Sequence, residues 1–352
     1  MTKLPPALPQ PALPPPASGP RHPARNATMA DVARAAQVSK MTVSRVLSGH
    51  GVAAATHARV MAAVQALGYV PDQGAHALST GRSGFVATLV PTINNSNFAD
   101  TARGLADCLM PSRLQLLLGF TEYDEAREED LVRAMLARRP EAVVLTGGRH
   151  APATQAMLAE AGLPVLETWE QPKHPLGCSV GFSNARAAGM LVRHLHAQGY
   201  RRIAFLGGEK GRDHRGEERE RGYRTAVAAL GLGPPRVIHH GIPPLSMQHG
   251  EDAVQLLMQR FPDSDAAFCV SDLSAFGAIM ECHRRGWAVP GRLAVAGFGD
   301  FEVSRVCHPR ITTVAVDGYA LGRATGEALL GALQARRTGQ AWPVQRHIAL
   351  PV

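Results

Sequence analysis

Residues 28–47 read Thr-Met-Ala-Asp-Val-Ala-Arg-Ala-Ala-Gln-Val-Ser-Lys-Met-Thr-Val-Ser-Arg-Val-Leu. The stretch holds two short helical patterns joined by a tight turn. In the first, residues 29–36, apolar positions recur at helical spacing: Val32, Ala33 and Ala36. Ser39 is the predicted N-cap of the second, residues 40–47, because its hydroxyl can accept from the first backbone amides of that helix.

The second of these helices has the composition of a DNA-reading element. Its apolar side chains, Val43, Val46 and Leu47, share one face. The other faces carry Lys40, Met41, Thr42, Ser44 and Arg45. A major groove admits a short helix with polar and basic side chains near its N-terminal end. The pattern therefore predicts a helix-turn-helix, with Thr28, Ser39 and these five residues at the DNA.

A third helix is predicted over residues 56–67, beginning at Thr56, with Val60, Ala63, Val64 and Leu67 on one face. The predicted DNA-binding domain thus spans residues 27–70, and residues 71–84 follow as a linker. Residues 1–26 are rich in Pro and Ala, show no apolar period and are expected to be disordered. No function is assigned to that extension.

The positive charge of the chain is concentrated in the same region. Residues 1–84 hold eight Lys or Arg and two acids, for a net charge of +6, whereas residues 85–352 hold 29 and 27, for +2. A basic segment attracts a phosphate backbone, with an affinity that falls steeply as salt rises. Composition alone fits a solvated basic terminus equally well; the helix-turn-helix pattern favours DNA.

Length and composition restrict the remaining possibilities. The 352 residues are too many for one small core and suggest two or three domains. We expect no membrane span and no secretory signal, because no long apolar run is present, and hence a cytoplasmic protein. The five cysteines are scattered without metal-ligand spacing, so they are expected to be reduced, with no metal and no cofactor.

From residue 85 short apolar runs alternate with longer helical patterns. Strands are predicted at residues 86–91, 114–119, 142–146 and 164–167, and in a second series at 178–181, 202–207, 236–239, 266–270 and 293–297. Helices are predicted between them, at residues 98–110, 126–138, 184–198, 217–230, 249–260 and 273–286. Such alternation indicates an α/β core of two doubly wound parallel sheets over residues 85–352. Ligands of these sheets sit beyond the carboxyl ends of strands.

These motifs resemble one known family. The stretch 28–47, with Thr56, Arg59-Val60, Leu67-Gly68-Tyr69-Val70-Pro71 and Ala75-His76-Ala77-Leu78, is similar to the LacI-type transcriptional regulators. Similarity extends over about residues 27–350 and is greatest to the gluconate-operon repressor branch, with shared segments at residues 38–45, 180–182 and 296–298. The resemblance implies a helix-turn-helix head and a periplasmic-binding-protein-like core with a ligand cleft between its two halves.

The resemblance also assigns DNA contacts. It implies that Lys40 and Met41 set operator preference, by donation to guanine and by contact with a thymine methyl. It implies that Thr42, Ser44 and Arg45 bind phosphates or base edges, and that Thr56 also contacts DNA. Gln37 occupies the turn position where the family usually has Gly, which costs of order 1 kcal/mol if that residue is left-handed.

The linker corresponds to the family's hinge, which becomes helical on operator DNA. There Leu78 is expected to wedge into the minor groove and kink the duplex, although an ordinary linker leucine remains the alternative. Ala75 is small enough for a paired hinge helix to approach closely. His76 stands where Arg is usual, and Asp72 where Asn is usual. A head that reads one half-site implies a two-fold dimer and an imperfectly palindromic operator.

The resemblance places effector contacts in the second half of the core. Arg219 matches a cleft arginine three residues before a Gly-aromatic pair, although the charged run around it fits a solvated helix face as well. Asp272 follows a strand and is expected either to accept from ligand hydroxyls or to cap the next helix. Asp300, at the end of the next strand motif, is the other expected contact. Sugar-binding relatives often have Asp at the position of Gly299 in this chain.

In the first half, strand ends carry the remaining candidates: Asn97, Phe98, His150 and Glu167. Each fits a loop or packing residue as well as a ligand contact. Arginines suit a carboxylate, so a sugar acid is expected: gluconate, a ketogluconate or 6-phosphogluconate. Together these features predict a ligand-controlled DNA-binding repressor that acts as a homodimer. A solute-binding protein with the same core is the alternative, and no enzyme motif was found.

Overall fold

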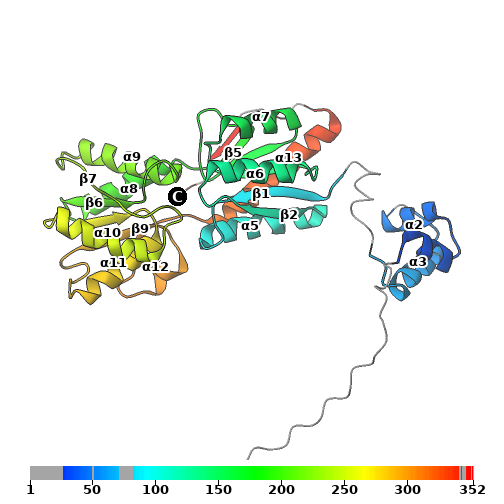
Figure 1. The fold of residues 1–352 in the computed structure, drawn as a ribbon, viewed down its shortest axis with the longest axis horizontal. Coiled ribbons are helices and arrows are strands. Elements are labelled where there is room, and N and C mark those ends of the chain that lie inside the picture. The colour runs from blue at the N-terminus through cyan, green and yellow to red at the C-terminus, as the bar shows by residue number, and fades with distance from the viewer. Residues whose placement is uncertain are drawn as a thin grey trace, which may run out of the picture. The chain divides into compact units, whose positions relative to one another are not determined.

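The computed structural model describes residues 27–49, 51–70, 82–340, 342, 346–349 and 351. The chain divides into two compact units, one with the three N-terminal helices and one with everything from the first strand onward (Figure 1). The predicted extension, residues 1–26, and the predicted hinge residues Asp72, Ala75, His76 and Leu78 lie outside the described residues.

The head consists of α1 (Met29–Ala35), α2 (Lys40–Leu47) and α3 (Ala54–Ala66). Thr28 caps α1: its side chain accepts from the backbone N–H of Asp31, whose carboxylate accepts from the backbone N–H of Thr28. Ser39 caps α2 by accepting from the backbone N–H of Thr42 at 3.1 Å. The predicted cap of the second helix is thus confirmed.

A small apolar core holds the three helices together. It contains Val32, Ala33, Ala36, Val43, Val46, Val60, Ala63 and Tyr69. The predicted inward faces of the first two helices are therefore confirmed. Leu67 was expected on the inward face of the third helix, and this was wrong: it follows the end of α3 and is 40% exposed, while Tyr69 fills the core from just beyond it.

The first sheet of the core has six parallel strands in the order β11-β5-β4-β3-β1-β2. They are β1 (Phe85–Val90), β2 (Gln115–Phe120), β3 (Val143–Thr146), β4 (Val165–Thr168), β5 (Cys178–Gly181) and β11 (Arg346–Ala349). Two helices cover each face. These are α5 (Ser96–Leu109) with α13 (Gly318–Thr338), and α6 (Glu125–Leu136) with α7 (Pro152–Ala161). A short 3-10 helix, η1 (Met110–Ser112), follows α5. We call this sheet with its helices the first subdomain.

The second sheet has five parallel strands in the order β10-β9-β8-β6-β7. They are β6 (Ile203–Gly207), β7 (Arg236–His239), β8 (Ala266–Cys269), β9 (Ala294–Gly299) and β10 (Thr312–Ala315). The helices α8 (Asn184–Ala197) and α9 (His214–Ala229) pack on one face, and α10 (Met247–Arg260) and α11 (Asp272–Arg284) on the other. The short helix α12 (Glu302–Val306) lies beside α11. This is the second subdomain.

The expected architecture of two doubly wound parallel sheets is confirmed, with one correction. Residues 178–181 were grouped with the second series of strands, but β5 pairs with β4 and belongs to the first sheet. The chain crosses to the second subdomain only after β5 and returns through α13, which packs on α5. The strands before and after this crossover have the same apolar pattern, so the sequence does not show on which side of it β5 belongs.

The end of the predicted linker is fastened to the first subdomain. The carboxylate of Glu141 accepts from the backbone N–H of Gly84 at 3.1 Å and from Nη2 of Arg82 at 3.3 Å. These bonds fix the residues just before β1 against the segment just before β3.

Candidate functional site

The second helix of the head exposes the side chains predicted to meet DNA. Lys40, Met41, Ser44 and Arg45 of α2 are exposed, with Met41 at 72%, and Thr42 is half-buried. Val43 and Val46 anchor the opposite face in the head core. A helix that leaves a large thioether and a lysine exposed at its N-terminal turn has surface suited to base edges.

The other three predicted DNA contacts of the head lie at helix starts. Ser39, the N-cap of α2, is exposed. Thr28 is half-buried and its hydroxyl bonds Asp31 at 2.7 Å; Thr56 is half-buried in the first turn of α3. Gln37, in the turn between α1 and α2, has φ 52° and is therefore left-handed, as its place in the sequence predicted.

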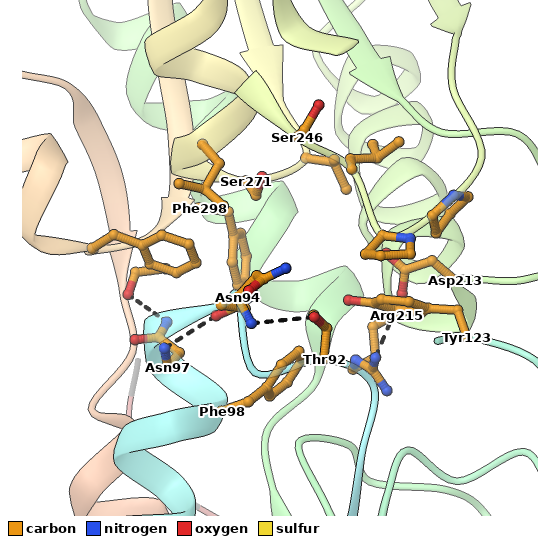
Figure 2. A pocket seen from close by; sticks show the side chains of 18 of the residues that line it. Thr92, Asn94, Asn97, Phe98, Tyr123, Asp213, Arg215, Ser246, Ser271 and Phe298 are labelled. Atoms are coloured by element: carbon orange, nitrogen blue, oxygen red, sulfur yellow. Dashed lines mark hydrogen bonds and ion pairs between the residues drawn. The ribbon is translucent and has the colours of Figure 1, made fainter. Parts of the chain in front are cut away.

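The core contains a cavity of about 290 Å³ at the carboxyl ends of strands from both sheets (Figure 2). Its lining side chains follow strands β1, β2, β4, β7, β8 and β9 or come from the start of α9. The lining residues with ring or charged side chains are Phe98, Tyr123, Trp169, Asp213, Arg215, Arg219, Phe298 and Phe301. This is the position at which doubly wound sheets bind ligands.

Arg219 reaches this cavity from α9 and is held entirely by the second subdomain. Its Nε donates to Oδ1 of Asn184 at 2.9 Å and its Nη1 to the carbonyl of Val270 at 2.8 Å. The guanidinium lies 3.8 Å above the ring of Phe298. Burial lowers the pKa of Arg219 to about 10, so it stays protonated at neutral pH. None of the hydrogen bonds and ion pairs found for Arg219 in the described part of the chain involves a carboxylate.

Two buried polar atoms at the cavity lack hydrogen-bond partners among the described residues, although one of them, Oδ1 of Asp213, lies 3.8 Å from Nη2 of Arg215. They are Oδ1 of Asp213 and Nε1 of Trp169. Trp169 is 3% exposed and has φ 71°, a left-handed conformation that is costly for a bulky residue. Buried polar atoms are normally paired, so these two indicate a missing donor and a missing acceptor.

The predicted contacts Asn97 and Phe98 also line the cavity. Both are buried at the start of α5. Nδ2 of Asn97 donates across the cleft to the carbonyl of Gly299 at 2.8 Å, and Phe98 packs edge-on against Trp169 at 5.2 Å. With Arg219, three of the predicted effector contacts come together here (Figure 2).

His150 and Glu167 lie elsewhere, in the interior of the first subdomain. Nδ1 of His150 is 2.7 Å from Glu128 and Nε2 is 3.5 Å from Glu167, and all three residues are buried. Burial disfavours the charged imidazole, but the two carboxylates outweigh it and raise the pKa of His150 to about 9. His150, Glu128 and Glu167 therefore form a buried ion cluster that does not line the cavity.

Asp272 and Asp300 do not line the cavity either. Asp272 is fully buried and accepts from the backbone N–H of Phe301 at 2.8 Å and from Oγ1 of Thr313 at 2.6 Å. Burial raises its pKa. Asp300 pairs with Arg305 at 2.6 Å. Asp272 therefore holds the loop that carries Phe301 to the cavity wall.

The structure adds Arg215, Asp213 and Tyr123 to the cavity, which the sequence analysis did not single out. Arg215 and Asp213 lie in a crowded run of charges that looks like a solvated helix face. The available signal was spacing: Arg215 precedes Arg219 by one helical turn and so shares its face.

Within the described ranges, no group of His, Cys, Asp and Glu has the arrangement of a metal site. No described helix is long and apolar enough to cross a membrane.

Comparisons with known proteins agree with both units. Residues 28–72 match the family model "Bacterial regulatory proteins, lacI family", and residues 192–349 match "Periplasmic binding protein-like domain". The chain is 32% identical to HTH-type transcriptional regulator GntR of Escherichia coli K12, over 86% of this chain and 91% of the relative. It is 35% identical to GntR of Pseudomonas aeruginosa, over 86% and 88%. A solved LacI family transcriptional regulator from Silicibacter pomeroyi is 46% identical and has a TM-score of 0.71, over 76% of this chain and 95% of that one.

Proposed function

The chain belongs to the lacI family of bacterial regulatory proteins and is a DNA-binding transcriptional regulator, and from that premise we propose that a small sugar acid such as gluconate controls its affinity for operator DNA. Its curated relatives are regulators, not enzymes. A protein whose partner is the bacterial chromosome works in the cytoplasm.

The DNA-binding part of the proposal rests on α2. Lys40 and Met41 read base edges from the first turn of the helix, and Thr42, Ser44 and Arg45 contact phosphates or bases. Thr28, Ser39 and Thr56 place backbone N–H groups of helix starts near phosphates. A two-fold homodimer then reads an imperfect palindrome, with Ala75, His76 and Leu78 as hinge contacts in the minor groove.

The effector part is carried by one observation: Arg219 presents a half-buried positive charge at the cavity, held by a carbonyl, an amide and a ring. The described cavity lining holds Arg215 and Arg219 against the single carboxylate of Asp213. A buried charge is costly unless it is paired. An anionic ligand group at Arg219 supplies that pair through a charge-assisted hydrogen bond.

The unpaired polar atoms support a hydroxylated ligand. Oδ1 of Asp213 can accept from a hydroxyl, and Nε1 of Trp169 can donate to one. The aromatic rings of Phe98 and Phe298 supply flat apolar walls for a carbon chain. At about 290 Å³ the cavity lies at the small end of ligand sites, which suits one six-carbon acid better than a disaccharide or nucleoside.

The test is binding by the full-length protein to gluconate, 2-ketogluconate, 6-phosphogluconate and the neutral sugar glucose. Calorimetry gives affinity, and anisotropy of a labelled palindromic fragment from upstream of the gene gives the effect on DNA binding. We expect at least one acid to bind and to change operator affinity, and glucose to do neither. Glucose binding as tightly as every acid would contradict the role of Arg219.

A further inference from the structure

Arg215 is carried by the second subdomain, where its Nη2 lies 3.8 Å from Oδ1 of Asp213, but its hydrogen bond and its ring contacts are all with the first. It lies in the first turn of α9 and is 6% exposed. Its Nη1 donates to the carbonyl of Thr146, at the end of β3, at 3.3 Å. Its guanidinium lies 5.5 Å from the ring centre of Phe98 and 5.5 Å from that of Tyr123, which follow β1 and β2 (Figure 2).

The backbone of the first subdomain leaves room for this guanidinium at a glycine. Gly147, which follows Thr146, has φ 106°, and a Cβ there would lie 3.0 Å from Nη1 of Arg215. A side chain at residue 147 would therefore be strained in backbone and would press on the guanidinium. Arg215 is therefore in contact with two rings, one carbonyl and one glycine of the first subdomain.

Arg219, one turn further along α9, has the opposite attachment. Its hydrogen-bond partners Asn184 and Val270 and its ring partner Phe298 all belong to the second subdomain. The same helix face thus presents two arginines to one cavity. One is fixed within its own subdomain, and the other is inserted into the opposite one.

From this contrast we propose that Arg215 is the positioning residue that holds the two subdomains closed and transmits effector occupancy to the DNA-binding head. The inference rests on the proposed function. A ligand on Arg219 fills the space beside Arg215 and favours the arrangement in which that guanidinium is seated. Separation of the subdomains withdraws Arg215 from Phe98, Tyr123 and Thr146 together. Only a contact that differs between the two states can transmit occupancy.

Two buried amides also bridge the subdomains: Nδ2 of Asn97 donates to the carbonyl of Gly299, and Nδ2 of Asn184 to that of Trp169. Both are neutral, whereas Arg215 inserts a charge. The other charged contacts that cross lie nearer the solvent. Arg212 is 3.6 Å from Asp124, and these side chains are 44% and 37% exposed. Nη2 of Arg149 donates to the carbonyl of Gly211 at 3.1 Å. Exposed ion pairs contribute little to an equilibrium. Arg212 therefore offers a matched control: it has the same charge, lies three residues away and bridges the same two subdomains.

The first experiment measures closure without any ligand. The chain has three tryptophans, so Trp287→Phe and Trp342→Phe leave Trp169 as the only reporter, inside the cleft. We expect Arg215→Met to raise acrylamide quenching of Trp169 several-fold in the full-length protein, and Arg212→Met to leave it unchanged. Arg215→Lys, which keeps the charge but loses the planar fork, should be intermediate. Unchanged quenching in Arg215→Met, with circular dichroism intact, overturns the proposal.

The second experiment measures coupling, with D-gluconate as the probe. In allosteric proteins an effector typically changes affinity at the second site by about 5–150-fold. We expect Arg215→Met to bind gluconate more weakly, since one positive charge leaves the cavity. At saturating gluconate, the ratio of its operator affinities with and without gluconate should be close to unity. Arg219→Met should lose gluconate binding while keeping Trp169 protected. A wild-type ratio in Arg215→Met overturns the inference.

The two proposals fail separately. If the wild-type protein does not bind gluconate, the assignment of the sugar acid fails, while the ligand-free quenching of Trp169 still decides the role of Arg215. A second outcome separates them in the other direction. Trp169 of Arg215→Met could be quenched no more than in the wild type, while gluconate binds the wild-type protein and changes its operator affinity. In that case the effector proposal stands and the positioning role of Arg215 is wrong.

Discussion

Oδ1 of Asn184 accepts a hydrogen bond from Nε of Arg219 at 2.9 Å. The Nδ2 of the same amide donates to the backbone carbonyl of Trp169 at 2.9 Å. One neutral side chain, just after the crossover from β5, therefore orients the cleft arginine and joins it to the end of β4. Because the amide is neutral, the charge of Arg219 stays available to a ligand.

Asn184→Asp and Asn184→Ala separate charge from orientation. Both variants lose the bond to Trp169, but only the aspartate neutralises Arg219. We expect Asn184→Asp to weaken gluconate binding by at least about tenfold, or about 1.4 kcal/mol, beyond the loss in Asn184→Ala. Calorimetry on the two variants measures the difference. Equal losses would mean that the charge of Arg219 does not recognise the ligand.

The buried triad of His150 gives the core a dependence on pH. Its pKa of about 9 in the folded protein exceeds the ordinary value of 6.5, so the folded state binds the proton more tightly than the unfolded one. That stabilisation is complete below about pH 6.5 and is lost as the pH rises through 9. The shift corresponds to a contribution on the order of 3 kcal/mol.

Replacing His150 tests this contribution. We expect His150→Gln to lower the melting temperature most below pH 6.5 and to flatten its dependence on pH up to about 9. The exposed His174→Gln is the control, because it removes an imidazole from the surface. Thermal melts of the three proteins across this range measure the effect. Parallel curves for wild type and His150→Gln would show that the imidazole is not charged in the fold.

The turn of the head stores strain at Gln37. With φ 52°, this residue occupies a conformation that costs an L-residue about 1–2 kcal/mol and costs glycine nothing comparable. After the greater unfolded-state entropy of glycine is subtracted, Gln37→Gly should stabilise the head by about 0.5–1 kcal/mol. Ala58→Gly, within α3, should destabilise it by about the same amount. Hydrogen exchange of the head amides measures both effects. If Gln37→Gly does not slow this exchange, the assignment of strain to Gln37 is wrong.

Lys40 is the sharpest test of base reading by the head. We expect Lys40→Ala to weaken operator binding by about 1–3 kcal/mol and to relax the preference at one base pair of each half-site. Arg138→Ala removes the same charge from the exposed surface of the core and should change neither. Anisotropy titrations against single-base operator variants give the result. A uniform loss on all variants would instead identify Lys40 as a phosphate contact.

Much of the fold followed from local patterns. The caps and inward faces of α1 and α2 are local, and the nine strands expected in the core lie within a few residues of observed ones. The sequence did not predict that β5 belongs to the first sheet, and it did not predict β10, α7 or α13. Strands of both sheets have the same pattern, so the pattern does not show where the chain crosses over. Only α13, which packs on α5, depends on contact between segments far apart in sequence.

The candidate site was predicted less completely, for a related reason. Strand order brought Asn97 and Phe98 to the cavity, since both follow a strand end. The same rule also selected His150, which turns inward to Glu128. A position at a strand end fixes the edge of the sheet but leaves the direction of the side chain open. Arg215 was overlooked because a charged run hides which of its members is buried.

The return of the chain through α13 has a consequence for synthesis. The first subdomain closes only when α13 packs on α5 and β11 joins β5, whereas the head is complete by residue 70. At about 5–20 residues per second, translation from residue 70 to 349 takes roughly 15–60 s. During that interval a nascent chain carries a finished DNA reader with no working sensor. A single head reads only one half-site, so control of a palindromic operator by an effector begins only when the core of each chain is complete.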